Sequence, residues 1–191
     1  MIIGITGGTG CGKTTLLNCI AEKGGLVLDC DAIYHRLLQT DPVLLQAIEN
    51  RFPGVVENGE LQRKKLGNMV FSDKSALSDL NKITHQAIFQ EVERQLQTAP
   101  NLVAIDAIAL FESGLAELCH TTVAVVAPQE DRVRRLMARD GISEEYARKR
   151  IAAQHSSEDF LAMCCHTLEN NGELGAFRTK CLAFLSKFDI I

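Results

Sequence analysis

Residues 7–14 read Gly-Gly-Thr-Gly-Cys-Gly-Lys-Thr, directly after the apolar run Ile-Ile-Gly-Ile-Thr at residues 2–6. The apolar run is typical of a buried strand, and the pattern of residues 13–22 is typical of a helix. Glycines let the connecting turn curl so that its backbone N–H groups face an anion, and the helix N-terminus adds positive charge. The stretch therefore predicts a strand, an anion-binding loop and a helix.

The glycine-rich turn fits the spacing G-x-x-x-x-G-K-[ST], a motif that binds nucleoside triphosphates. Lys13 is predicted to reach the β- and γ-phosphates, and the hydroxyl of Thr14 is predicted to ligate Mg²⁺. The alternative is a glycine-rich turn that only caps a helix. The preceding strand and the following helix favour the triphosphate site, so we expect the chain to bind ATP.

Cys11 lies inside this loop, beside the start of the helix. A helix N-terminus lowers the pKa of a thiol and favours the thiolate. We therefore hypothesise that thiol reagents inactivate the protein and that ATP protects it. The alternative is an inert small residue in a tight loop.

Acidic residues follow two other apolar runs. Asp29 and Asp31 come after residues 26–28, and Asp106 comes after residues 102–105. If the strand continues to Asp31, both carboxylates lie on one face, at the sheet edge where ligands bind. Asp31 is then the candidate base for an acceptor hydroxyl, and Asp106 the candidate carboxylate beside Mg²⁺. The alternative is that one or both of the first two acids cap the next helix.

The remaining pattern predicts an α/β protein with a parallel sheet. Apolar runs at residues 26–28, 102–105 and 121–127 read as strands, and residues 167–169 form a weaker candidate. Strands this apolar are buried on both faces, so helices should cover both sides of the sheet. Residues 36–99 read mainly as helices.

Basic residues concentrate in the segment 132–150. Gly141 is expected to end a first helix there, and Ser143 to begin a second one that carries Arg150 and Gln154 one turn apart. Three arginines share one face of the first helix: Arg132, Arg135 and Arg139.

Two helices joined at a glycine and rich in arginine suit a lid that closes over a phosphoryl group and excludes water. We expect Arg139 and Arg150 to touch the nucleotide. The alternative, a solvated helix face, fits most of the other cations in this segment.

The composition predicts one globular domain. The chain has 191 residues, 46% of them hydrophobic, and a formal net charge of −4. This acidic balance argues against a nucleic-acid or anionic-membrane partner, because such binders need a cationic surface. No apolar run approaches the ~18–20 residues of a membrane span, and the first residues lack the basic flank of a secretion signal. We expect a cytoplasmic protein, monomeric or weakly homo-oligomeric.

Seven cysteines are present without regular spacing. In a chain without a secretion signal, an odd set predicts free thiols in a reducing cytoplasm. Cys164 and Cys165 are adjacent, whereas structural zinc sites need spaced pairs, so no zinc site is expected.

Along nearly its whole length the chain resembles the dephospho-coenzyme A kinase family. The family motif T-G-G-x-G-x-G-K-[ST]-T appears at residues 6–15, and its D-A-D element appears as Asp-Cys-Asp at residues 29–31. Its G-x-L-x-R stretch matches residues 59–63, and its pattern R-D-G-[LI]-S-E-E…A-R-x-R-I-A-A-Q matches residues 139–154. The family D-N-x-G reads Glu-Asn-Asn-Gly at residues 169–172.

The resemblance has local departures. The family His-Pro pair is His85-Gln86, and its D-x-P-L-L-F-E stretch lacks the proline at residues 106–112. Cys30 and Cys165 stand where alanine and aspartate are usual. Because proline fixes φ, we expect the loop after Asp106 to be less preorganised than in the family.

The resemblance implies a three-layer P-loop kinase fold with a five-stranded parallel sheet, a helical acceptor-binding insertion and a helical lid. The implied core comprises residues 1–35, 101–128 and 160–191. The implied insertion is 36–100, and the implied lid is 129–159.

The resemblance also implies transfer of the ATP γ-phosphate to the ribose 3′-hydroxyl of dephospho-coenzyme A, with ATP and Mg²⁺ required. The expected catalytic residues are Asp31, Lys13 and Arg139. ATP is expected to contact Gly10, Cys11, Gly12, Lys13, Thr14, Thr15, Arg139, Arg150 and Asn170. The acceptor is expected to contact Asp31, His85 and Asp106, and Mg²⁺ to contact Thr14 and Asp106.

Two other functions compete with this one. Another P-loop kinase, acting on a nucleoside monophosphate or a small hydroxyl metabolite, fits the loop and the lid equally well. A regulatory GTP-binding switch would read guanine with N-K-x-D, and the nearest match, at residues 81–84, lacks the acid.

Overall fold

The computed structural model describes residues 1–188. The chain divides into two compact units, one formed by residues 1–28 with the chain from Ala99 onward, the other by residues 29–98. Residues 189–191, which end the predicted core segment, lie outside the described residues.

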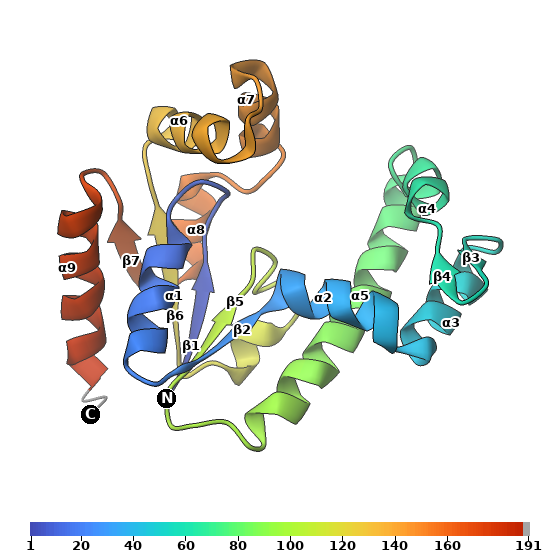
Figure 1. Cartoon of the computed structure of the whole chain (residues 1–191), viewed down its shortest axis with the longest axis horizontal. Helices are drawn as coiled ribbons and strands as arrows, with labels where there is room; N and C mark the ends of the chain where they lie inside the picture. Colours follow the sequence, from blue (N-terminus) through green and yellow to red (C-terminus); the bar gives the residue numbers. More distant parts are fainter. Residues whose placement is uncertain (189–191) are drawn as a thin grey trace. The chain divides into compact units, whose positions relative to one another are not determined.

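Within residues 1–188, five strands form the main sheet of the first unit (Figure 1). Their order is β2 (Leu26–Asp29), β5 (Val103–Asp106), β1 (Ile2–Thr6), β6 (Thr121–Val126) and β7 (His166–Glu169). The central strand β1 runs parallel to both neighbours, with Ile5 opposite Asp106 on one side and Val123 on the other. The predicted parallel sheet is confirmed, including its weaker candidate strand.

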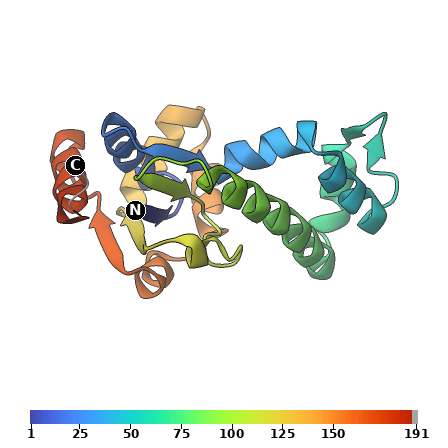
Figure 2. The same cartoon turned by 90° about the horizontal axis from the view of Figure 1, so that it is seen from below.

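Helices cover both faces of this sheet, as expected from its apolar strands. On one face lie α1 (Lys13–Glu22) and α9 (Leu174–Leu185), whose apolar side chains pack on Ile3 and Ile5. Figure 2 shows α9 beside the edge strand β7. On the other face lie α8 (Ser157–Met163) and the short 3₁₀ helix Leu115–Leu118. Gly4 faces this second side, where a Cβ atom would come within 2.8 Å of Cys119 Sγ.

Two further helices follow β6 as predicted. Helix α6 (Gln129–Asp140) ends at Gly141 (φ 64°), and α7 (Glu144–Ala152) begins after the N-cap Ser143. The helices share a small core of Val133, Leu136, Ala147 and Ile151. One expectation is wrong, because α7 ends at Ala152 and Gln154 lies beyond it.

The second unit is mainly helical. It contains α2 (Cys30–Thr40), α3 (Pro42–Arg51), α4 (Arg63–Val70) and the long α5 (Lys74–Leu96), on which the other three pack (Figure 1). It also contains a hairpin of β3 (Val56–Glu57) and β4 (Glu60–Leu61), which the helical prediction for residues 36–99 missed. Asn58 and Gly59 form its turn with φ values of 53° and 79°, and Asn-Gly is a strong signal for such turns.

Among residues 1–188, none of the helices has the length and the apolar run that crossing a bilayer requires.

Candidate nucleotide-binding site

The loop between β1 and α1 has the shape that its glycines require. Gly7, Gly10 and Gly12 have φ values of 141°, 77° and 99°, which side chains with a Cβ rarely adopt. A Cβ at Gly7 would also lie 2.2 Å from the carbonyl oxygen of Val125, and one at Gly12 would lie 2.3 Å from Asn170 Nδ2. The loop is therefore packed closely against the carboxyl ends of β6 and β7.

Residues from distant parts of the chain bind the backbone of this loop. Arg132 Nε donates to the carbonyl oxygen of Thr9 over 2.9 Å, while the N–H of Thr9 donates to Gln154 Oε1 over 2.8 Å. The backbone N–H and carbonyl oxygen of Thr9 are thus both held by side chains that follow β6.

The next carbonyls of the loop are held in the same way. Arg135 Nη1 donates to the carbonyl oxygen of Gly10 over 3.2 Å and to that of Cys11 over 3.4 Å. Asn170 Nδ2 also donates to Cys11, over 2.9 Å. In a trans peptide the C=O of one residue and the N–H of the next point in opposite directions. The N–H groups of Gly10 and Gly12 are therefore directed away from these side chains, as an anion cradle requires.

Lys13 and Asp106 meet beside the loop. Lys13 Nζ donates to the carbonyl oxygen of Gly7 over 3.1 Å and lies 3.7 Å from Asp106 Oδ1. The two side chains are only 15% and 17% exposed. The parallel pairing of β1 with β5 places Asp106 opposite Ile5, immediately before the loop. The two residues expected to meet the phosphates and the metal are therefore neighbours.

The remaining predicted loop residues begin α1. Thr14 is exposed, and the N–H of Thr15 donates to the carbonyl oxygen of Gly12. Cys11 is 2% exposed, and burial raises the pKa of its thiol despite the opposing effect of Lys13. The expected lowering of the Cys11 pKa is therefore wrong, because desolvation outweighs the helix terminus. The alternative, a small inert residue in a tight loop, describes it better.

The loop after β5 is held by hydrogen bonds although it lacks the family proline. The N–H of Ala107 donates to the carbonyl oxygen of Ile5, and Thr6 Oγ1 donates to that of Ile108, both over 3.1 Å. Farther along, Glu112 Oε1 lies 2.5 Å from His155 Nε2.

Arg139 and Arg150 do not contact the loop in this structure. Both pair with Asp140, Arg139 through Nε at 2.6 Å and Arg150 through Nη1 at 2.7 Å. The arginines on the loop are Arg132 and Arg135, which sequence reasoning left without a role. Helical periodicity placed Arg132, Arg135 and Arg139 on one face, but it does not say which turn of that face meets the loop.

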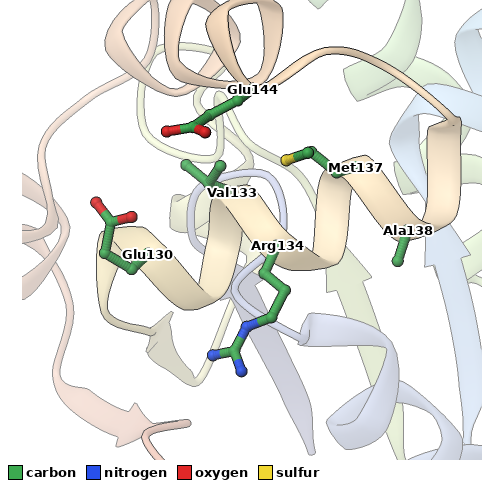
Figure 3. A pocket seen from close by; sticks show the side chains of 6 residues that line it. All are labelled: Glu130, Val133, Arg134, Met137, Ala138 and Glu144. Carbon is green, nitrogen blue, oxygen red and sulfur yellow. The ribbon is translucent and has the colours of Figure 1, made fainter.

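A pocket of about 610 Å³ lies on the opposite face of α6 (Figure 3). Its lining residues are Glu130, Val133, Arg134, Met137, Ala138 and Glu144. Successive helix residues are 100° apart, so this face is separate from the one that carries Arg132 and Arg135. The pocket is therefore not part of the phosphate site.

The predicted acceptor residues Asp31 and His85 belong to the second unit. Strand β2 ends at Asp29 and α2 begins at Cys30, so the two acids do not share a strand face, contrary to our expectation. Asp29 is the N-cap, because its carboxylate accepts from the N–H of Ala32 over 3.0 Å. Asp31 is exposed in the first turn of α2, and His85 is half-buried in α5.

Comparison with known proteins agrees with this geometry. A family model described as dephospho-CoA kinase matches residues 1–175. A dephospho-CoA kinase of Syntrophotalea carbinolica is 33% identical over 98% of this chain and 92% of its own length. The dephospho-CoA kinase of Saccharomyces cerevisiae is 34% identical over 91% of this chain and 77% of its own.

Solved structures show the same fold. The protein TT1252 of Thermus thermophilus superposes with a TM-score of 0.82 at 34% identity, covering 98% of this chain and 97% of its own. A dephospho-CoA kinase of Campylobacter jejuni superposes with a TM-score of 0.68 at 26% identity, covering 98% of this chain and 96% of its own. A shikimate kinase of Bacteroides thetaiotaomicron superposes with a TM-score of 0.58, covering 97% of this chain and 98% of its own. At 16% identity it shares the fold alone. The chain belongs to the dephospho-CoA kinase family.

Proposed function

We propose that this protein transfers the γ-phosphate of ATP to the ribose 3′-hydroxyl of dephospho-coenzyme A, giving coenzyme A and ADP. The main support is the glycine loop with Lys13 and Asp106 beside it, in a chain that the family model matches over residues 1–175. In cells this reaction is the last step of coenzyme A synthesis.

The loop supplies most of the ATP site in this proposal. Backbone N–H groups of the loop, those of Gly10 and Gly12 among them, and the N-terminus of α1 bind the β- and γ-phosphates. Lys13, which contacts the Gly7 carbonyl in this structure, moves a short distance to follow the γ-phosphate. Such fixed positive groups stabilise the charge on the phosphoryl group during transfer.

Asp31 is the proposed base for the acceptor hydroxyl. Asp29 is the other candidate of the pair, but its carboxylate is engaged in capping α2. Asp31 lies two residues farther along, inside the first turn of the helix, and is exposed, so it is accessible to an acceptor. His85 and the insertion 36–100 are proposed to bind the rest of dephospho-coenzyme A.

Asp106 and Thr14 are the proposed Mg²⁺ ligands. Carboxylate and hydroxyl oxygens are donors that Mg²⁺ prefers, and the ion draws its other ligands from phosphates and water. When bound, Mg²⁺ neutralises charge on the β- and γ-phosphates.

The segment 129–159 is proposed to act as the lid. Arg139 and Arg150 are held near each other by their shared partner Asp140. Closure would bring both guanidinium groups to the nucleotide and exclude water, which otherwise competes with the acceptor. Asn170 is proposed to serve the nucleotide site as well, alongside its contact with Cys11.

The cellular setting is part of the proposal. The seven cysteines are free thiols, which supports a reducing cytoplasm. We propose a monomer or weak homo-oligomer that binds these small molecules and neither nucleic acid nor membrane.

The deciding experiment follows labelled phosphate from [γ-³²P]ATP into dephospho-coenzyme A, with nucleoside monophosphates offered in parallel. We expect label on dephospho-coenzyme A at the 3′ oxygen, identified by its removal with a 3′-nucleotidase. Faster labelling of a nucleoside monophosphate would instead favour the alternative small-molecule kinase.

A further inference from the structure

A positive charge is buried directly behind the phosphate loop. Arg132 is 5% exposed, and its guanidinium lies against Gly8 so closely that a Cβ there would come within 2.2 Å of Nη2. Nε donates to the carbonyl oxygen of Thr9, and Nη2 lies 3.4 Å from Gln154 Oε1. Both of these partners are neutral.

Four other arginines of this segment have acidic partners, whereas the partly buried Arg135 donates to backbone carbonyls. Arg134 pairs with Asp131, Arg139 and Arg150 with Asp140, and Arg148 with Glu130 and Glu144. For Arg132, by contrast, no carboxylate lies within 4.0 Å in the part of the chain from residue 1 to residue 188. A buried charge without a countercharge is costly, and proteins normally neutralise it.

The position of Arg132 adds to this cost. It lies in the first turn of α6, where the helix N-terminus is itself positive and cations are unfavourable. Burial also lowers the pKa of its guanidinium, as expected for a desolvated cation. The two acids of that turn, Asp131 and Glu130, pair with Arg134 and Arg148, so among residues 1–188 no carboxylate forms an ion pair with Arg132.

We propose that Arg132 is a positioning residue of the nucleotide site whose buried charge is neutralised by the triphosphate of ATP. Its hydrogen bond orients the Thr9–Gly10 peptide, so that the N–H of Gly10 points toward the phosphates. Its charge is separated from them by the loop backbone only. The inference rests on the proposed function only for ATP binding and not for the acceptor.

The test compares Arg132→Gln and Arg132→Lys with a matched control, Arg134→Gln, an exposed arginine two residues away. Dissociation constants for adenosine, ADP and ATP with Mg²⁺ are measured by calorimetry without any acceptor. For Arg132→Gln we expect ATP affinity to fall about tenfold or more, ADP affinity to fall less, and adenosine affinity to change little. Arg132→Lys should recover part of the loss, and Arg134→Gln should match wild type.

Thermal stability provides the second measurement. Because the buried charge costs free energy without nucleotide, Arg132→Gln should melt no lower than wild type without ligand and gain less from ATP. A merely structural role predicts a lower melting temperature and equal losses for adenosine and ATP, and that result would overturn the proposal. Equal ATP affinity in Arg132→Gln and wild type would overturn it too.

The outcome is separable from the proposed function. A wild-type protein that binds ATP as expected but does not label dephospho-coenzyme A would overturn the function and leave the role of Arg132 standing. Should Arg132→Gln not fold, the inference depends on Arg132→Lys. A loss of affinity in Arg132→Lys that is larger for ATP than for adenosine supports it, and either no loss or a loss equal for adenosine and ATP contradicts it.

Discussion

The side-chain amide of Asn170 donates to the carbonyl oxygen of Cys11 over 2.9 Å, joining the end of β7 to the phosphate loop across 159 positions of the chain. Asn170 is 5% exposed, and its own N–H donates to the carbonyl oxygen of Val126 over 2.8 Å. The residue therefore fixes the loop to the ends of two neighbouring strands.

Replacing this amide by a carboxylate should damage the site. In Asn170→Asp the donor is lost and a negative charge faces both the Cys11 carbonyl and the phosphates. We expect unfolding free energy to fall by about 1–3 kcal/mol and ATP affinity to fall about tenfold. Urea unfolding and calorimetry check this. Asn171→Asp is the control, because an aspartate there still accepts from Lys180. Normal ATP affinity in Asn170→Asp would show that the contact is dispensable.

Lys13→Ala should lose turnover and ATP affinity together. The variant removes the cation beside Asp106, so the carboxylate then repels the phosphates. We expect kcat to fall by about a hundredfold or more, as for other losses of fixed transition-state charge. Steady-state kinetics test this. The control is Lys23→Ala, which changes an exposed lysine just beyond α1. A Lys13→Ala enzyme with normal kcat would contradict the site.

Asp31→Asn should lose turnover while ATP affinity stays nearly intact. Loss of a general base costs about 10²–10⁴ in rate. The matched variant Asp29→Asn should retain activity, because asparagine is an equally good N-cap. The measurement is kcat beside the ATP dissociation constant. Equal turnover in Asp31→Asn and wild type would remove this residue from catalysis.

Thiol reagents should modify Cys165 before Cys11. Hydrogen bonds from Thr122 lower the pKa of the exposed Cys165 thiol, whereas burial raises the pKa of Cys11. Burial also raises the pKa of neighbouring Cys164, to about 11. We expect iodoacetamide at pH 7.5, about one unit below the ordinary cysteine value, to label Cys165 first and to leave activity intact. Peptide mapping over time tests the order, and Cys165→Ser should abolish the fast phase. ATP-protected labelling of Cys11 as the first event would contradict this order.

The second unit should lose stability in acid through the protonation of Glu91. Arg94 and Arg36 hydrogen-bond its carboxylate and lower its pKa from 4.5 to about 2. A lowered folded-state pKa stabilises the protein above the unfolded-state value, and this contribution is lost as pH falls from about 4.5 to about 2. Melting temperatures of wild type and Glu91→Gln should therefore differ at pH 7 and converge toward pH 2. Glu93→Gln, an exposed neighbour on α5, is the control. A difference independent of pH would contradict this linkage.

The sequence by itself determined the features that depend on neighbours along the chain. The strand before Gly7, the helix after Gly12, the end of α6 at Gly141 and the start of α7 at Ser143 all follow from glycine conformations, caps and apolar periodicity. The capping role of Asp29 also depends on local sequence, because an aspartate directly before a helix is a favoured N-cap. The Asn58-Gly59 turn also depends on local sequence, because both residues tolerate the positive φ that it requires, although the surrounding pattern predicts helix.

Only the tertiary structure decided which side chains bind the loop and how buried they are. Periodicity places Arg132, Arg135 and Arg139 on one face of a helix, yet packing of α6 against the loop selects the first two and leaves the third with Asp140. The pKa of the Cys11 thiol is raised for the same reason, because desolvation depends on how residues far away in the chain pack around it. Burial and long-range contact arise from the whole packed structure, and local sequence carries no measure of either.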